Sequence, residues 1–131
     1  MNKVGEIITW QRTFTEQDVG EFGRLSGDQG IHHIAPDEEG QLMVQGLLTA
    51  TLPTKIGGDL NFIARCMEFQ FLLPVYTGDQ ITCEARLTEW SEEEKVIRVG
   101  VEWACRKQGE AVVMTGRASG VIRRTALKEA R

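Results

Sequence analysis

Apolar and polar side chains alternate along most of the second half of the chain. Within residues 79–90 and 96–105, apolar residues fall at alternate positions. A period of two places successive side chains on opposite faces, so both segments are predicted to be half-buried β-strands. Two further strands are predicted at about residues 61–73, ending before Pro74, and at about residues 111–123. The second half of the chain therefore predicts four antiparallel strands in succession.

The first half of the chain predicts a strand and a helix. Residues 4–14 are expected to form a strand that joins the other four in one sheet. Thr15 followed three residues later by Asp18 is typical of a helix start, because the two side chains cap each other's backbone N–H groups. The segment Ser26-Gly27-Asp28 is expected to end this helix.

A second helix is predicted over residues 43–57, with Val44–Leu52 as its central part. Its apolar residues lie at helical spacings, and it is too apolar to lie on a solvated surface. We expect it to kink at Pro53 or to end just before it, because proline lacks a backbone N–H. The sheet is expected to wrap around this helix.

These elements predict an α+β fold, with an antiparallel sheet of five strands wrapped around a central helix. The length of 131 residues is typical of one domain, so residues 1–131 are expected to form a single domain. The net charge of −4 offers no basic excess for a phosphate backbone, and nucleic-acid binding is not expected. No apolar run approaches a membrane span, and residues 1–10 lack the apolar core of a signal peptide, so a cytoplasmic location is expected.

The three cysteines do not suggest a metal site or a disulfide framework. Cys66, Cys83 and Cys105 are too widely spaced for a zinc motif. All three lie in alternating segments, and we expect buried, reduced thiols. A catalytic thiol is the less favoured alternative.

The candidate chemistry lies in a loop between the two predicted helices. The loop holds both histidines of the chain, and Asp28 precedes His33 by five residues. Gly27 and Gly30 permit tight turns that can aim both side chains into one pocket. An aspartate and a histidine can hold a water between them and exchange its proton, with side-chain atoms roughly 5–6 Å apart across two hydrogen bonds.

Other interpretations of the loop remain open. Asp28 can instead cap a helix or form a surface turn. His32 and His33 can bind metal, although adjacent side chains tend to point apart and few other ligands lie nearby. A serine hydrolase is less favoured, because Ser26 is not in a Gly-x-Ser-x-Gly motif.

Gly46 stands at the start of the predicted apolar helix. The first N–H groups of a helix have no partner within it and lie at its positive end, which suits a developing oxyanion. The alternative is that Gly46 only permits close packing.

Three stretches of the chain, residues 22–33, 44–48 and 69–79, carry a resemblance. They are similar to the MaoC-like (R)-specific enoyl-CoA hydratases and dehydratases, a family of hotdog folds, whose motif runs Ser/Thr-Gly-Asp-x-Asn-Pro-aliphatic-His. The matching residues here run Ser26-Gly27-Asp28-Gln29-Gly30-Ile31-His32-His33. The later segments Val44-Gln45-Gly46-Leu47 and Phe71-Leu72-Leu73-Pro74-Val75-Tyr76-Thr77-Gly78-Asp79 also match. The resemblance covers the chain from about residue 14 to residue 123.

The resemblance implies a function in fatty-acid metabolism. It implies reversible hydration of a trans-2-enoyl-CoA to an (R)-3-hydroxyacyl-CoA, with Asp28 and His33 as the catalytic pair and the Gly46 N–H as the oxyanion donor. The substrate is then an acyl-CoA or an acyl carrier protein thioester, and no metal or redox cofactor is needed. A single hotdog domain leaves an open sheet edge, so we expect a homodimer or a multiple of dimers.

The chain departs from the family motif at three positions. Gly30 replaces an asparagine, Ile31 replaces a proline, and Gln45 replaces the histidine that commonly precedes the glycine. Two alternative functions therefore stay open: a hotdog acyl-CoA thioesterase and a non-catalytic subunit that binds acyl thioesters. Against the thioesterase, residues 44–52 carry no acid.

Overall fold

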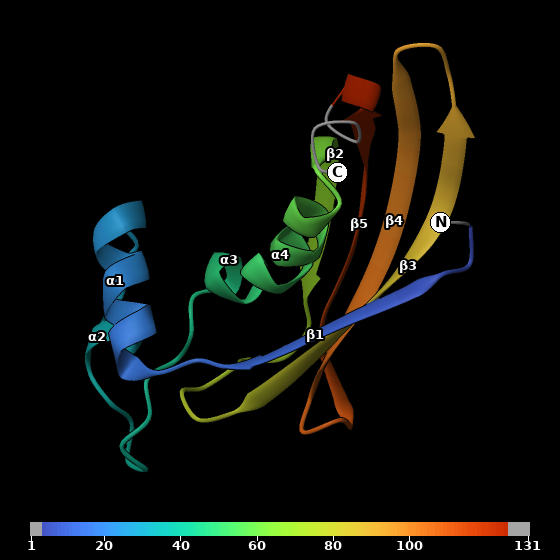
Figure 1. Cartoon of the computed structure of the whole chain (residues 1–131). Coiled ribbons are helices and arrows are strands. Elements are labelled where there is room, and N and C mark those ends of the chain that lie inside the picture. Colours follow the sequence, from blue (N-terminus) through green and yellow to red (C-terminus); the bar gives the residue numbers. More distant parts are fainter. Residues whose placement is uncertain (1–3, 126–131) are drawn as a thin grey trace.

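A five-stranded antiparallel sheet curves around one helical segment in the computed structural model, which describes residues 4–125 (Figure 1). The strands are β1 (Ile7–Thr13), β2 (Phe62–Phe71), β3 (Gln80–Glu92), β4 (Val96–Lys107) and β5 (Ala111–Arg123). The helices are α1 (Glu16–Ser26), α2 (Ile31–Ile34), α3 (Gly46–Thr49) and α4 (Thr51–Asp59). The predicted hotdog architecture is confirmed. The ends of the expected domain, residues 1–3 and 126–131, lie outside the described residues.

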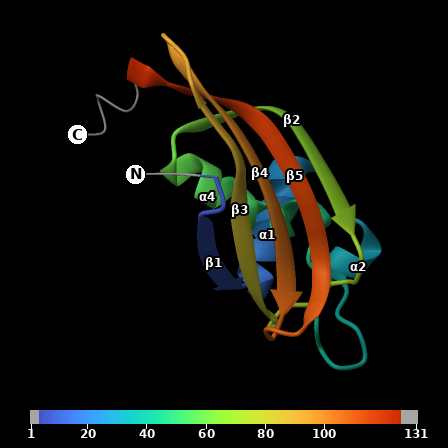
Figure 2. The same ribbon diagram turned by 90° about the vertical axis from the view of Figure 1, so that its right-hand side faces the viewer.

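The strand order is β1-β3-β4-β5-β2, and all neighbours are antiparallel. The five predicted strands therefore exist, but β2 does not pair with β3, which follows it in the chain. It crosses instead to the far edge and pairs with β5. Figure 2, in which the sheet lies in front of the helices, shows that the helices cover one face of the sheet.

The alternating strands bury one face against the helices. In β3 the apolar residues of the pattern are buried, and they are Ile81, Cys83, Ala85 and Leu87. The helical side contributes Leu52 and Ile56 from α4, both buried. Since the buried strand residues and α4 belong to the same apolar core, the sheet is curved around α4 as predicted.

Trp103 and Gly116 face each other across β4 and β5 in this core. A Cβ atom built on Gly116 would lie 2.6 Å from Trp103 Cζ2 and 2.4 Å from the Glu68 carbonyl oxygen. No side chain fits there, so the indole ring occupies the space that Gly116 leaves free.

The predicted capping box of α1 is present. The Thr15 side chain accepts a hydrogen bond from the Asp18 N–H at 3.1 Å, and the Asp18 carboxylate accepts one from the Thr15 N–H at 2.9 Å. Gly27 then ends the helix with a left-handed φ of 80°. The predicted start and end of this helix are both confirmed.

The central helix breaks earlier than predicted. Its two parts, α3 and α4, meet at Ala50, and Pro53 lies inside the first turn of α4. The reason is the hydrogen-bond ladder: the N–H that proline lacks would have bonded to the Thr49 carbonyl, four residues earlier. The interruption therefore falls before Pro53, and the helix continues through it to Asp59.

The residues before Gly46 are extended, contrary to the predicted helix over Val44–Leu52. The Val44 N–H donates to the Val75 carbonyl at 2.7 Å, and Met43 forms an isolated bridge with Tyr76. These bonds draw the segment onto the chain that precedes β3. The N–H groups of Met43 and Val44 thus find partners outside any helical turn.

Two of the three cysteines are buried as expected. Cys83 and Cys105 are opposite each other on β3 and β4. A hydrogen bond with Cys83, together with burial, raises the pKa of the Cys105 thiol. Cys66 is exposed, so the expectation was wrong there: it lies beside a β-bulge on the edge strand β2, on the face away from the helices.

No helix within residues 4–125 has the length and apolar character needed to cross a membrane.

The position of Pro53 generates a test of the helix break. We expect Pro53→Ala to change the free energy of unfolding by less than about 1 kcal/mol, because a proline in a first turn removes no bond that the helix uses. Moving the proline one position, as Pro53→Ala with Thr54→Pro, removes the bond from the Thr54 N–H to the Ala50 carbonyl. The free energy of unfolding of this double variant, measured by urea denaturation, should be lower by about 3 kcal/mol. Equal stabilities would contradict the assignment of the break.

Candidate active site

Asp28 is placed by the turn that ends α1. The Ser26 hydroxyl donates to the Phe22 carbonyl at 2.7 Å and accepts a hydrogen bond from the Asp28 N–H at 3.0 Å. The Asp28 carboxylate lies 3.5 Å from the Gly30 N–H, so it also holds the next turn. The capping interpretation of Asp28 thus describes part of its contacts, and its second carboxylate oxygen is directed at His33.

His33 is held in a fixed tautomer by the backbone. It lies on α2, a helical turn within the segment that the sequence predicts only as a loop, and the residue is 8% exposed. Its Nδ1 lies 2.6 Å from the Met43 carbonyl oxygen. A carbonyl can only accept, so Nδ1 carries a proton and donates it. In neutral His33 the lone pair is therefore on Nε2.

Asp28 and His33 are in direct contact. The distance from Asp28 Oδ2 to His33 Nε2 is 3.5 Å, which is shorter than the expected separation for a pair bridged by one water. It is also longer than an ordinary N–H···O hydrogen bond, so the two groups form a loose pair. The Asp28 side chain is 52% exposed and the His33 side chain is 6% exposed. Asp28 is therefore the solvent-facing member of the pair, and His33 is the buried one.

A groove of about 370 Å³ runs past His33 and Gly46. Its wall is otherwise mostly apolar and includes residues 71–75, which follow β2 in the chain. His32 lines the groove too, whereas Asp28 is not part of its wall and reaches it only through His33. The structure thus brings two of the three predicted site residues to one groove and places the third in contact with one of them.

Gly46 is the first residue of α3, and its N–H has no partner within that helix. A Cβ atom built on Gly46 would lie 3.0 Å from Phe71 Cε1, so the Phe71 ring lies against the glycine backbone. Both predicted roles of Gly46 therefore have a basis: the absence of a side chain permits close packing, and it also leaves the backbone open to the groove.

The sequence does not reveal two contributors to this site. The Met43 carbonyl fixes the orientation of His33, but a backbone group leaves no mark in the residue pattern. Gln45 is buried and donates from Nε2 to the Val19 carbonyl at 3.0 Å. The departure from the family motif at this position is the only sign of it in the sequence.

The rings of His32 and His33 lie close together, with centroids 3.9 Å apart. No group of three or more histidine, cysteine or acidic side chains that could hold a metal ion is present in the described part of the chain.

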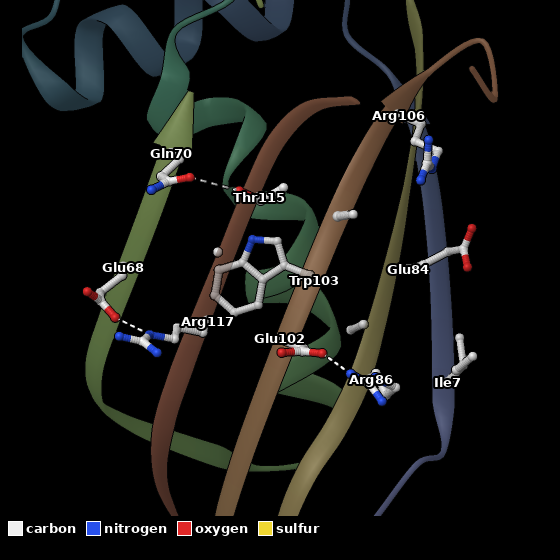
Figure 3. Close-up of a pocket in the computed structure, with 13 residues that line it drawn as sticks. Ile7, Glu68, Gln70, Glu84, Arg86, Glu102, Trp103, Arg106, Thr115 and Arg117 are labelled. Carbon is white, nitrogen blue, oxygen red and sulfur yellow. Dashed lines mark hydrogen bonds and ion pairs between the residues drawn. The ribbon is translucent and has the colours of Figure 1, made fainter. Parts of the chain in front are cut away.

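A larger hollow lies elsewhere, on the face of the sheet away from the helices (Figure 3). Its volume is about 520 Å³, and its centre is a row of paired charges that crosses four strands. In register, the row runs Arg86, Glu102, Arg117, Glu68. Arg86 pairs with Glu102, and Arg117 pairs with Glu68 and lowers its pKa. These four charges pair with one another, and Glu84 and Arg106 also line the hollow.

Comparisons with known proteins agree with this architecture. No family model matches the chain. A mitochondrial 3-hydroxyacyl-[acyl-carrier-protein] dehydratase of Solanum lycopersicum, FERN, is 25% identical over 129 residues, covering 92% of this chain and 77% of the relative. The structure of an (R)-hydratase from A. caviae involved in PHA biosynthesis is 27% identical, with a TM-score of 0.80 over 92% of this chain and 96% of that chain. The resemblance to the MaoC-like hydratases is confirmed.

A MaoC-like dehydratase from Rhodospirillum rubrum supports the fold alone. It is 16% identical, with a TM-score of 0.74, and the match covers 93% of each chain. The plant relative is named as mitochondrial, so the cytoplasmic location of this chain stays a prediction.

The contact with Met43 predicts the tautomer of His33. When the His33 ring is neutral, we expect its signals in ¹H–¹⁵N imidazole spectra to report a protonated Nδ1 and an unprotonated Nε2, because the Met43 carbonyl requires a donor. Asp28→Asn should leave this tautomer unchanged, since Nδ1 and the carbonyl remain in place. A protonated Nε2 in the neutral ring would contradict the arrangement.

Proposed function

We propose that this chain catalyses the reversible addition of water to a trans-2-enoyl thioester, which gives an (R)-3-hydroxyacyl thioester. The observation that carries the proposal is the contact between Asp28 and His33 at the groove that Gly46 also lines. The names of the A. caviae hydratase and the plant dehydratase support the same reaction class. The thioester activates its own double bond, so the chain needs to supply only proton transfer and charge stabilisation.

The steps balance without another reactant. A water held by the pair loses a proton to it, and the oxygen bonds to the β carbon. The electrons of the double bond move onto the thioester oxygen, where the Gly46 N–H stabilises the enolate. The proton then passes from the pair to the α carbon, and the pair returns to its starting state.

The tautomer of His33 suits this role. With Nδ1 bound to Met43, Nε2 can accept a proton, and the resulting imidazolium is stabilised by the Asp28 carboxylate 3.5 Å away. Such a positioned pair contributes through general acid–base catalysis.

An apolar cavity offers room for an acyl chain. It has a volume of about 200 Å³ and lies between α4 and the sheet, with Phe62 in its wall. Leu48 and Leu52 are buried in the core and do not line this cavity. Thr49 of α3 lines the groove and Pro53 of α4 lines the cavity, so the two spaces border consecutive parts of the helical segment.

We also propose that two copies associate through β2, the edge strand beside the groove. Exposed apolar side chains cluster along and just after this strand, and they are Ile63, Met67, Phe71, Leu72 and Leu73. An open, apolar strand edge favours pairing with another strand. The groove wall includes the residues that follow β2, so a second copy would lie next to the active site.

The catalytic pair can be tested with crotonyl-CoA. Asp28→Asn and His33→Ala should each lower kcat/KM by about 10²–10⁴-fold, because each removes an acid–base group. The double variant should lose little more than the worse single variant, since the two residues act on one water. Loss of absorbance at the enoyl thioester band measures the reaction.

His32→Ala is the matched control, because His32 lines the same groove but has no contact with Asp28 in the described structure. It should retain most of the activity. Release of free CoA thiol instead of hydration would indicate the thioesterase. Wild-type protein with neither activity on short or medium enoyl thioesters would overturn the enzyme proposal in favour of a binding subunit.

The association can be tested by light scattering at micromolar concentration. The wild-type chain should be a dimer or a multiple of dimers, and Ile63→Lys should shift it toward monomer, because a lysine on an edge strand opposes pairing. Ile7→Lys is the control: Ile7 is 58% exposed on the opposite edge strand, and Ile63 is 43% exposed. If the two variants behave alike, β2 is not the contact surface.

A further inference from the structure

Gln45 is the most deeply buried polar side chain beside the site. It is 1% exposed, and Nε2 donates to the Val19 carbonyl of α1 at 3.0 Å. Its backbone carbonyl accepts the N–H groups of Leu48 and Thr49, both at 3.0 Å. One residue therefore begins α3 through its backbone and fastens that point to α1 through its side chain.

The same spot on α1 also supports the segment that carries Asp28. Gly23 is buried, and a Cβ atom built on it would lie 3.4 Å from the Asp28 carbonyl oxygen and 3.5 Å from Gln45 Nε2. The missing side chain allows both segments to approach α1 at one place. The segments that carry Asp28 and Gly46 are far apart in the chain, and both are thus positioned by packing against α1.

Packing alone does not explain a glutamine here. Gln45 Oε1 is buried and has no hydrogen-bond partner among the described residues. A buried polar atom without a partner destabilises a fold, and an apolar side chain of similar size would avoid that cost. The Val19 carbonyl is an interior helix carbonyl that has a helical N–H as a second donor, so it does not depend on Gln45.

We propose that Gln45 is a positioning residue for the hydration reaction. Its amide holds the start of α3 against α1 and so sets the Gly46 N–H relative to the Asp28–His33 pair. This inference rests on the proposed function, because the groups it aligns are those of that reaction. A displacement of the oxyanion donor by about 1 Å is enough to cost on the order of 10²-fold in rate.

Gln45→Met tests the proposal, because methionine keeps the length and volume and removes the donor. We expect kcat on crotonyl-CoA to fall by about 10- to 100-fold with little change in KM, since the loss acts on the transition state. The thermal midpoint should stay the same or rise. A residue with a purely structural role would show the opposite: a lower midpoint and an unchanged kcat per folded molecule.

Gln41→Met is the matched control. Gln41 Nε2 donates to the Thr77 carbonyl at 3.1 Å, a similar amide-to-carbonyl bond that does not involve the groove or α1. This variant should retain wild-type kcat. A similar loss of kcat in Gln41→Met and Gln45→Met would overturn the proposal.

Gln45→Glu provides a readout in pH and decides the question if the methionine variant does not fold. Burial raises the pKa of a carboxyl group, and only its protonated form can donate to Val19. The ratio of variant to wild-type kcat should therefore be highest at low pH and fall as pH rises, with circular dichroism showing a folded chain throughout. A flat ratio overturns the positioning role.

The outcome for the wild-type chain separates the two proposals. Active wild-type protein with Gln45 variants of unchanged kcat overturns the positioning role alone. Wild-type protein that hydrates no enoyl thioester overturns the proposed function, and the positioning role falls with it.

Discussion

Burial of the apolar segment that forms α3 and α4 is the constraint on which the rest of the structure depends. The segment has too few polar groups to face water, so the sheet must curve around it and cover it. At the start of this segment Gln45 and Leu48 are buried, Leu47 is exposed, and Gly46 lines the groove that His33 also lines. The fold and the candidate oxyanion site thus have the same origin.

The site is assembled from parts that other demands have already placed. The end of α1 brings Asp28 into position, and a backbone carbonyl from the extended segment before α3 orients His33. Gln45 carries a cost in stability, because its buried Oε1 has no hydrogen-bond partner in the described structure, as is also true of Trp103 Nε1. Proteins commonly accept such costs where the chemistry requires them.

The sequence predicts the elements of this fold better than their connections. Strict alternation identifies β3 and β4, and the pair Thr15 and Asp18 identifies the start of α1, because these depend on local periodicity and capping. The pairing of β2 with β5 depends on which edge is free after the core forms, and no local pattern contains that information. The sequence predicts the helix break at or just before Pro53, whereas it lies at Ala50, because proline affects the carbonyl four residues earlier. The sequence does not reveal the contact of His33 with Met43, because that contact involves only a backbone oxygen.

Two features of the sheet also discriminate against misregistered pairing during folding. A shift of one residue would turn apolar side chains to solvent, but a shift of two preserves both faces and escapes that penalty. On the outer face, such a shift of β5 along β4 would move Arg117 from Glu102 to the neutral Gly100 or Ala104. On the inner face it would set the Trp103 ring against Met114 or Ala118 in place of Gly116. The charge row and the glycine therefore specify a register that hydrophobic alternation alone leaves ambiguous.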